Sequence, residues 1–199
     1  MRVILASGSV RRRKWLESQE WLHNHDFEVM PLNLVESDHV SPGDVLGTVN
    51  NVARAKAETA IHAFEGNASD WLILVSDTLV ENPKTGGIMG KPRGREEAER
   101  MLSSLSGRSH KVHTCTVLIA SDMSEVEAYS ESAVVSMACL KKGELSSLIN
   151  GESWIGKAGS YDIMGPAGKY MRLMSGSVLT VSGLAESAVE RLKEILSRK

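Results

Sequence analysis

The spacing of apolar and polar residues changes along the chain between patterns typical of strands and patterns typical of helices. Residues 3–6 and 71–75 are short apolar runs without alternation, which indicates strands buried on both faces. Residues 27–34 alternate loosely and predict a further strand. After Pro42, apolar side chains recur at helical spacing from residue 45 to residue 64 and predict a long amphipathic helix ending at residues 66–68. Strands and helices in this order predict an α/β fold.

The rest of the chain predicts further strands and helices. The small residues Ser7-Gly8-Ser9 lead into a helix from about Arg11, and a turn at residues 82–87 predicts a hairpin that returns through residues 88–89. The later elements expected are a helix at Arg95–Leu105, strands at 111–120 and 127–140 joined by a turn at 121–124, a helix at 143–150, strands at 170–174 and 178–181, and a helix from about residue 186. No repeat or linker divides residues 1–199, so we expect one domain.

Composition narrows the class of protein. The chain has 199 residues, of which 42% are hydrophobic and 24% charged, as in ordinary globular proteins. A formal net charge of −2 makes nucleic acid an improbable partner. The two cysteines, Cys115 and Cys139, provide no disulfide framework, and no run approaches the roughly 20 apolar residues of a membrane span. The first apolar run is too short for a secretory signal, so we expect a cytoplasmic protein without membrane contact.

Residues 7–14 carry the first candidate chemistry. Small residues between a strand and a helix leave backbone N–H groups free, and the helix dipole favours an anion there. Arg11 and Arg12 oppose that dipole, and a bound polyphosphate would reverse the penalty because guanidinium groups bind phosphate bidentately. The alternative is a solvated basic helix face with Ser9 as an ordinary N-cap.

Two carboxylates are candidate metal ligands. Asp77 follows a buried run, and carboxylates at strand ends commonly hold Mg²⁺ beside phosphates. Equally, Asp77 could end the strand as a turn residue. Glu36 lies between a strand and Pro42, and is either a second carboxylate near the metal or a solvated loop charge.

Two lysines are candidate phosphate ligands. Lys56 lies beside the apolar stripe of the long helix, where it either extends to solvent or reaches across a cleft. Lys91 follows the hairpin, but Gly90-Lys91-Pro92 lacks the spacing and the Ser/Thr of a phosphate-binding P-loop. Lys91 can still approach a polyphosphate.

Taken in order, these segments resemble the motifs of the Maf family. Leu5 to Arg12 is similar to L-A-S-x-S-P-R-R, and Ala53 to Ala57 is similar to A-x-x-K-A. The further matches are residues 76–80 with A-D-T-V-V, residues 90–92 and 105–112 with G-K-P…L-S-G-x-x-H-x-V, and the closing segments 157–163 and 181–184. The resemblance covers nearly the whole chain.

The resemblance implies an elongated, twisted mixed sheet flanked by helices, with two lobes around a central cleft. It implies hydrolysis of the α–β phosphoanhydride of a pyrimidine or modified nucleoside triphosphate, dTTP or UTP being favoured, with Mg²⁺ or Mn²⁺ as cofactor. A small-molecule nucleotide is then the partner, and a homodimer is possible. Carried over by motif, Asp77, Glu36 and Lys56 are catalytic, Asp77 and Glu36 hold the metal, and the residues that bind substrate phosphates are Ser7, Ser9, Arg11, Arg12, Lys56, Thr78 and Lys91.

Two positions depart from the family pattern. Val10 replaces a proline, which frees one φ angle but removes no ligand group. Met164 stands where the pyrimidine-type branch has glutamine, and a thioether cannot replace the hydrogen bonds of an amide. Two alternatives stay open. An inosine-triphosphate-type pyrophosphatase shares the general fold and reaction, although its opening motif has asparagine and lysine where this chain has Ser9, Arg11 and Arg12. The Met164 departure supports the other, a catalytically silent nucleotide- or nucleic-acid-binding regulator of cell division.

Overall fold

The computed structural model describes residues 1–34, 36–64, 70–121 and 126–198. The strands are β1 (Arg2–Leu5), β2 (Asp26–Val29), β3 (Trp71–Glu81), β4 (Ile88–Met89), β5 (Ser109–Ala120), β6 (Val126–Met137) and β7 (Met171–Ser175). The α-helices are α1 (Val10–Glu17), α2 (Val45–Phe64), α3 (Arg95–Leu105), α4 (Lys142–Asn150), α5 (Val178–Ser182) and α6 (Glu186–Ser197). The expected helix end at residues 66–68 and most of the expected turn at residues 121–124 lie outside the described residues.

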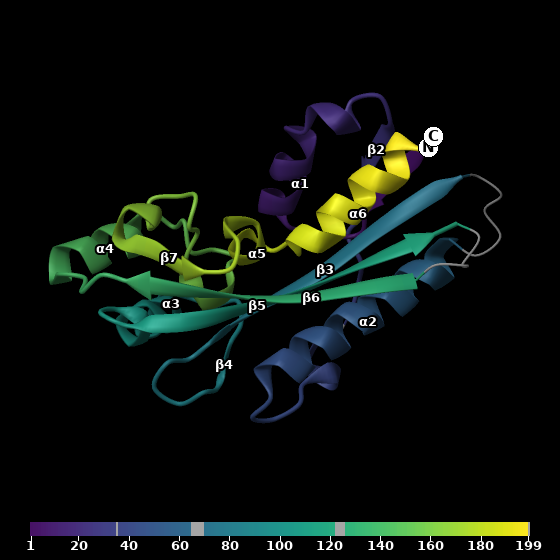
Figure 1. Cartoon of the computed structure of the whole chain (residues 1–199). Helices are drawn as coiled ribbons and strands as arrows, with labels where there is room; N and C mark the ends of the chain where they lie inside the picture. The colour runs from purple at the N-terminus through teal and green to yellow at the C-terminus, as the bar shows by residue number, and fades with distance from the viewer. Residues whose placement is uncertain (35, 65–69, 122–125, 199) are drawn as a thin grey trace.

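The strands of the described ranges form one mixed sheet in the order β2-β1-β3-β5-β6-β7, with β4 paired to β3. β1 runs parallel to both β2 and β3, whereas β3, β5, β6 and β7 run antiparallel to their neighbours. Three long, twisted strands, β3, β5 and β6, run along the long axis of the molecule, and β5 and β6 continue into the lobe that carries α3 and α4 (Figure 1). The predicted α/β fold with an elongated mixed sheet is confirmed.

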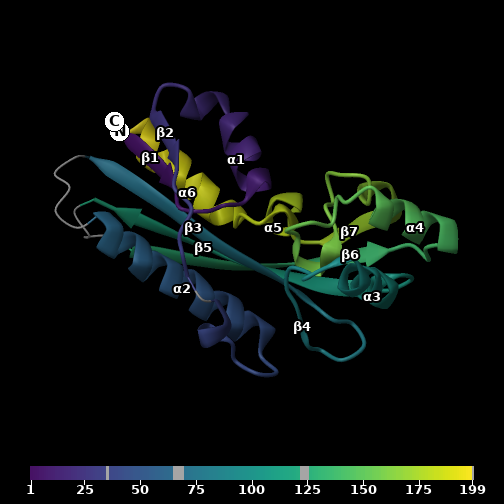
Figure 2. The same cartoon turned by 180° about the vertical axis from the view of Figure 1, so that it is seen from behind.

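Helices cover both faces of the sheet at one end. Alternate residues of β3 point to opposite faces: Ile73 and Val75 pack in a core with α2, whereas Leu72 and Leu74 pack in a core with α1 and α6. The view from behind shows α2 on one side of the strands and α1 and α6 on the other (Figure 2). This double coverage explains the apolar run without alternation, because both faces of β3 are buried here. None of the described helices is long and apolar enough to cross a membrane.

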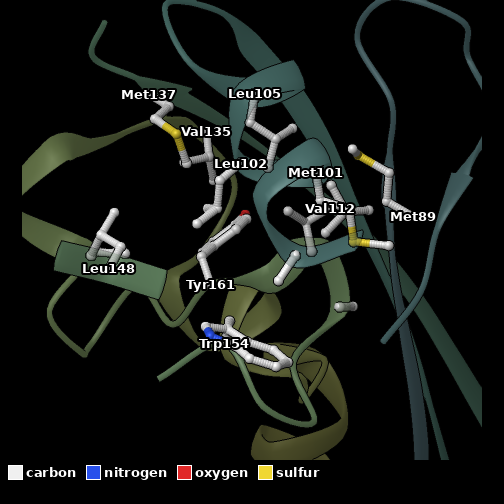
Figure 3. Packing of buried hydrophobic residues seen from close by; sticks show 14 of the residues in the cluster. Met89, Met101, Leu102, Leu105, Val112, Val135, Met137, Leu148, Trp154 and Tyr161 are labelled. Atoms are coloured by element: carbon white, nitrogen blue, oxygen red, sulfur yellow. The ribbon is translucent and has the colours of Figure 1, made fainter. Parts of the chain in front are cut away.

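A third core builds the other lobe. Side chains of α3 and α4 pack there against the far ends of β3, β5 and β6, around Tyr161 and Trp154 (Figure 3). The two lobes thus have separate cores and share the long strands.

Between the cores of the two lobes, one face of the sheet carries a band of hydroxyl groups, which we call the hydroxyl band: Ser76, Thr114 and Thr116, which are buried, and Thr78, which is half-buried. Ser76 Oγ lies 3.1 Å from Thr116 Oγ1 and donates to Gly183 O at 2.7 Å. Thr114 Oγ1 donates to Thr180 O at 2.8 Å. Because each hydroxyl has a partner, polar residues can occupy the middle of a buried sheet, and they fix α5 against it.

Four expectations about the elements were wrong. The strand expected at 127–140 is β6, which ends at Met137 together with its pairing to β7. β3 does not stop at Ser76 but continues to Glu81, since β5 pairs with it as far as Val80 and the hydroxyl band satisfies its polar side chains. β2 ends at Val29, where its pairing with β1 ends. Residues 178–182 form a helix rather than a strand, because Ser177 caps its N-terminus and Gly183, at φ 108°, ends it.

Candidate functional site

A gap in the sheet beside β3 creates the site. One edge of β3 pairs with β5 along almost its whole length. On the other edge, β1 pairs only with residues 71–74 and β4 only with residues 80–81, so no described strand covers residues 75–79. β1 stops at Leu5, and the chain turns away through Ser7-Gly8-Ser9 into α1. The sheet is therefore one strand short beside Asp77 and Thr78.

A cavity of about 340 Å³ lies at this gap. Every site residue expected from the sequence lines it, namely Ser7, Ser9, Arg11, Arg12, Glu36, Lys56, Asp77, Thr78 and Lys91. The remaining walls come from the turn before α1, from Pro31 and Leu32, and from residues 155–158 of the other lobe. The cavity therefore lies between the two lobes, where the resemblance placed a cleft.

The buried side chain of Arg12 connects the segments that form the walls of the cavity. Its guanidinium is buried and donates from Nη1 to Ser76 O at 2.9 Å and to Ser7 Oγ at 3.1 Å, from Nη2 to Thr78 Oγ1 at 2.9 Å, and from Nε to Gly183 O at 2.6 Å. Burial lowers the pKa of Arg12 to about 10, which leaves it charged at neutral pH. Most of its donors are thus committed to holding the walls together.

Lys56 joins the two candidate carboxylates. Its Nζ lies 2.7 Å from Asp77 Oδ1 and 2.8 Å from Glu36 Oε1, and its side chain is only 12% exposed. Of the two interpretations of Lys56, the structure therefore supports the one in which it reaches across a cleft. Asp77 comes from β3 and is 9% exposed, whereas Glu36 comes from the 3₁₀ helix Glu36–His39 and is 45% exposed. Asp77 does not end the strand, so the turn interpretation was wrong.

The surrounding charges keep Glu36 ionised. Partial burial opposes ionisation, but the hydrogen bond from Lys56 and the charges of Lys56, Lys91 and Arg12 lower the pKa of Glu36 below its ordinary value. Lys91 Nζ lies 3.9 Å from Glu36 Oε1.

On the opposite wall, Arg11 reaches from α1 to the other lobe. Its Nη1 donates to Tyr161 O at 3.4 Å and lies 3.8 Å from Asp162 Oδ1. Burial lowers the pKa of Arg11, and the charge of Asp162 partly compensates. Lys157 lines the same part of the cavity, and sequence reasoning assigned it no role. The only feature of the sequence that drew attention to Lys157 was its position at the start of the closing motif, residues 157–163.

A buried histidine supports this wall. His110 Nε2 lies 2.8 Å from Tyr161 Oη, and the two rings pack edge to face with centroids 5.4 Å apart. Burial lowers the pKa of His110 to about 4 and raises the pKa of Tyr161, so both rings are neutral at pH 7. Figure 3 shows Tyr161 deep in the core of this lobe. Met164, three residues later, is 76% exposed and does not line the cavity.

The cavity is strongly cationic for a chain with a net charge of −2. Five cationic side chains line it against the two carboxylates Asp77 and Glu36: Arg11, Arg12, Lys56, Lys91 and Lys157. Low-dielectric walls strengthen the field of this excess positive charge. Such a site can bind a polyanion next to a pair of carboxylates.

Comparison with known proteins agrees with this chemistry. The family model described as "Maf-like protein" matches residues 2–196. The dTTP/UTP pyrophosphatase of Acholeplasma laidlawii is 35% identical over 193 residues, covering 96% of this chain and 95% of the relative. The enzyme of the same name from Bacillus thuringiensis subsp. konkukian is 33% identical over 192 residues, covering 96% and 93%.

Among solved structures, a nucleoside-triphosphatase (dITP/XTP pyrophosphatase) from Mycobacterium abscessus matches with a TM-score of 0.44 and 16% identity, over 100% of this chain and 97% of that one. The family match, in contrast, extends over nearly every residue, and it includes all those that line the cavity. The chain belongs to the Maf-like protein family.

Proposed function

We propose that this protein is a nucleoside triphosphate pyrophosphatase, which cleaves the α–β phosphoanhydride of dTTP or UTP to give the monophosphate and pyrophosphate. The observation that carries the proposal is the cavity at the sheet gap, where cationic side chains outnumber carboxylates and the buried Asp77 forms an ion pair with Lys56. A triphosphate offers the negative charge that this cavity lacks.

The start of α1 supplies a further anion-binding feature. Ser9 caps the helix, whose first turn contains no acidic residue and borders the cavity. The free N–H groups and the positive end of the dipole attract phosphate oxygens there. A bound triphosphate also relieves the unfavourable placement of Arg11 and Arg12 in the first turn.

Asp77 is the better candidate for the general base. It is more buried than Glu36 and lies in the gap itself, whereas Glu36 comes from the neighbouring 3₁₀ helix and is 45% exposed to solvent. In this mechanism Asp77 accepts a proton from a water molecule as the water oxygen attacks the α-phosphorus. The bond between the α-phosphorus and the bridging oxygen breaks, and pyrophosphate leaves with that oxygen. Lys91 and Arg11 stabilise the charge that develops on the phosphates.

The same two carboxylates suit a divalent cation. The ammonium group of Lys56 already contacts one oxygen of Asp77 and one oxygen of Glu36, so the two carboxylates converge on a single positive charge. Mg²⁺ or Mn²⁺ is typically coordinated by one or two carboxylates together with substrate phosphates. Within the described residues no cluster of three acidic, histidine or cysteine side chains could hold a metal alone. We therefore expect the cation to bind with the nucleotide, and its chemistry would be to neutralise phosphate charge.

The preference for dTTP or UTP rests on the relatives of that name. Met164 is the reason to test it, since this side chain has no amide with which to recognise a base.

The decisive experiment measures pyrophosphate release from dTTP, UTP, CTP, 7-methyl-GTP, pseudouridine triphosphate, ITP and the standard purine nucleotides, with Mg²⁺, with Mn²⁺ and with EDTA. We expect cation-dependent release that is fastest with dTTP or UTP. In ¹⁸O-labelled water the label should appear in the monophosphate, because the attack is on the α-phosphorus. A preference for ITP would instead indicate the inosine-triphosphate type, and release of orthophosphate alone would overturn the proposed bond cleavage.

A further inference from the structure

We propose that Lys157, together with Arg11, forms the subsite that binds the pyrophosphate part of the substrate and holds it as it departs. The identity of this anion rests on the proposed function. The existence of an anion subsite does not, because it follows from the placement of two cationic side chains on one wall of the cavity.

The first argument is the pairing of the lining cations. Lys56 is bound to Asp77 and Glu36, Arg12 is committed to the walls, and Lys91 lies near Glu36. Lys157 Nζ donates to Ile155 O at 3.2 Å, and within the described ranges it forms no ion pair with a carboxylate. Its positive charge therefore remains available to a ligand.

The second argument is the repulsion between Lys157 and Arg11. Partial burial lowers the pKa of Lys157, the charge of Arg11 lowers it further, and only the charge of Asp162 acts in the opposite direction. Asp162 lies 3.8 Å from Arg11 and offsets part of that guanidinium's charge. Two like charges held together in a half-buried recess attract an anion that can lie between them.

The backbone around Lys157 is fixed, so that its side chain is presented by a rigid wall. Gly159 has φ 66°, and a Cβ atom there would lie 2.8 Å from Val80 Cγ2, so the segment packs directly on β3. The N–H of Gly159 donates to Gly90 O at 3.1 Å, just before Lys91. Because the backbone is already fixed, only the Lys157 side chain has to be ordered when it binds a ligand.

The position of this pair favours the departing phosphates over the α-phosphate. Asp77, the proposed base, is bonded to Lys56 of α2, whereas Arg11 is bonded to Tyr161 on the opposite wall. The water must attack near Asp77, so the α-phosphate lies on that side of the cavity. The leaving group carries several negative charges and gains stability where carboxylates are fewest.

The test compares Lys157→Ala and Lys157→Arg with the wild type, and uses Lys142→Ala as the control because Lys142 is an exposed lysine on α4, away from the cavity. Calorimetry gives the affinity for inorganic pyrophosphate and for dTMP, and steady-state kinetics gives kcat and KM for dTTP. Loss of one charge-assisted contact should weaken pyrophosphate binding roughly 10- to 100-fold in Lys157→Ala. We expect unchanged dTMP affinity, substantial retention of pyrophosphate binding in Lys157→Arg, and wild-type behaviour in Lys142→Ala.

Unchanged pyrophosphate affinity in Lys157→Ala would overturn the subsite. An equal loss of affinity for pyrophosphate and dTMP would place Lys157 at the monophosphate and overturn the assignment to the leaving group. The two proposals fail in different ways: a wild-type protein that releases pyrophosphate from no nucleotide contradicts the proposed function, while its direct binding of inorganic pyrophosphate still decides the role of Lys157.

Discussion

The ammonium group of Lys56 lies 2.7 Å from Oδ1 of Asp77, although the two residues belong to different elements, α2 and β3. The same ammonium group lies 2.8 Å from Glu36 Oε1. One lysine on the buried side of a helix therefore sets the distance between the two carboxylates of the site.

Asp77→Asn should remove the general base with little change in shape. We expect kcat for dTTP to fall by roughly 10²- to 10⁴-fold, the usual contribution of a positioned base, while pyrophosphate binding and the fold persist. Steady-state kinetics and circular dichroism check this. Glu58→Gln, an exposed carboxylate on α2, is the matched control. Near-full activity in Asp77→Asn would exclude Asp77 from the mechanism.

Arg12→Lys should destabilise the protein although it keeps the charge. A single ammonium group cannot reach acceptors as widely spread as Ser76 O, Thr78 Oγ1 and Gly183 O. Each of these acceptors loses a hydrogen bond from a charged donor, worth about 1.5–3 kcal/mol, and one ammonium group replaces only part of them, so we expect a loss of about 2–4 kcal/mol in the free energy of unfolding. Urea denaturation measures it. Arg13→Lys, at a neighbouring exposed position, should change little, and equal effects of the two substitutions would contradict this role for Arg12.

Gly183→Ala should disturb Arg12 directly. Gly183 has φ 108°, and its added Cβ would lie 2.9 Å from Arg12 Nε. Backbone strain of about 1–3 kcal/mol is expected from the φ angle alone, with a further loss of activity as Arg12 moves. Gly86→Ala separates the two effects, because Gly86 has φ 70° with open space around its Cβ position. If both variants keep full activity, the contact with Arg12 has no functional consequence.

Mild acid should destabilise the protein through His110. Burial lowers its pKa from 6.5 to about 4, so between these values the unfolded chain binds a proton that the folded chain does not. Stability from this residue is therefore complete above pH 6.5 and falls as the pH drops towards 4, by about 3 kcal/mol in total. Urea titrations at pH 7 and pH 5 should show a smaller acid loss in His110→Gln than in the wild type. His23→Gln, at an exposed position, should leave the wild-type loss unchanged, and a His110→Gln protein with the full acid loss would refute the assignment.

The sequence predicted the strands best where burial is uniform. The run at residues 71–75 was assigned correctly because both faces of β3 are covered, but the polar residues Ser76, Asp77 and Thr78 look locally like a turn. Only the tertiary hydrogen bonds of the hydroxyl band allow them to continue the strand. Likewise Val178 to Ser182 contains β-branched residues that favour a strand, whereas Ser177 and Gly183 cap it as a helix and its Thr180 bonds to Glu131.

The members of the candidate site were more predictable than their arrangement. All nine expected residues line one cavity. The order of the motifs along the chain was enough to identify these residues, although it contains no information about the distances between them. The pattern gave no sign that Arg12 binds four protein acceptors, since three of them, on Ser76, Thr78 and Gly183, come from distant segments of the chain. Lys157 was missed for a similar reason: its place depends on how residues 155–162 pack on β3, which no local periodicity records.

The four acceptors of Arg12 also impose an order on biosynthesis. They come from the loop after β1, from the middle of β3 and from the end of α5, so the last of them, Gly183, emerges from the ribosome only when most of the chain has been made. In a nascent chain that stops before Gly183, the Arg12 guanidinium lacks its closest partner, and the hydrogen bond that connects this wall of the cavity to the end of α5 is missing. This wall of the cavity can therefore form fully only after Gly183 has been synthesised, and a proteolytic cut that releases the segment containing Gly183 would remove the same contact.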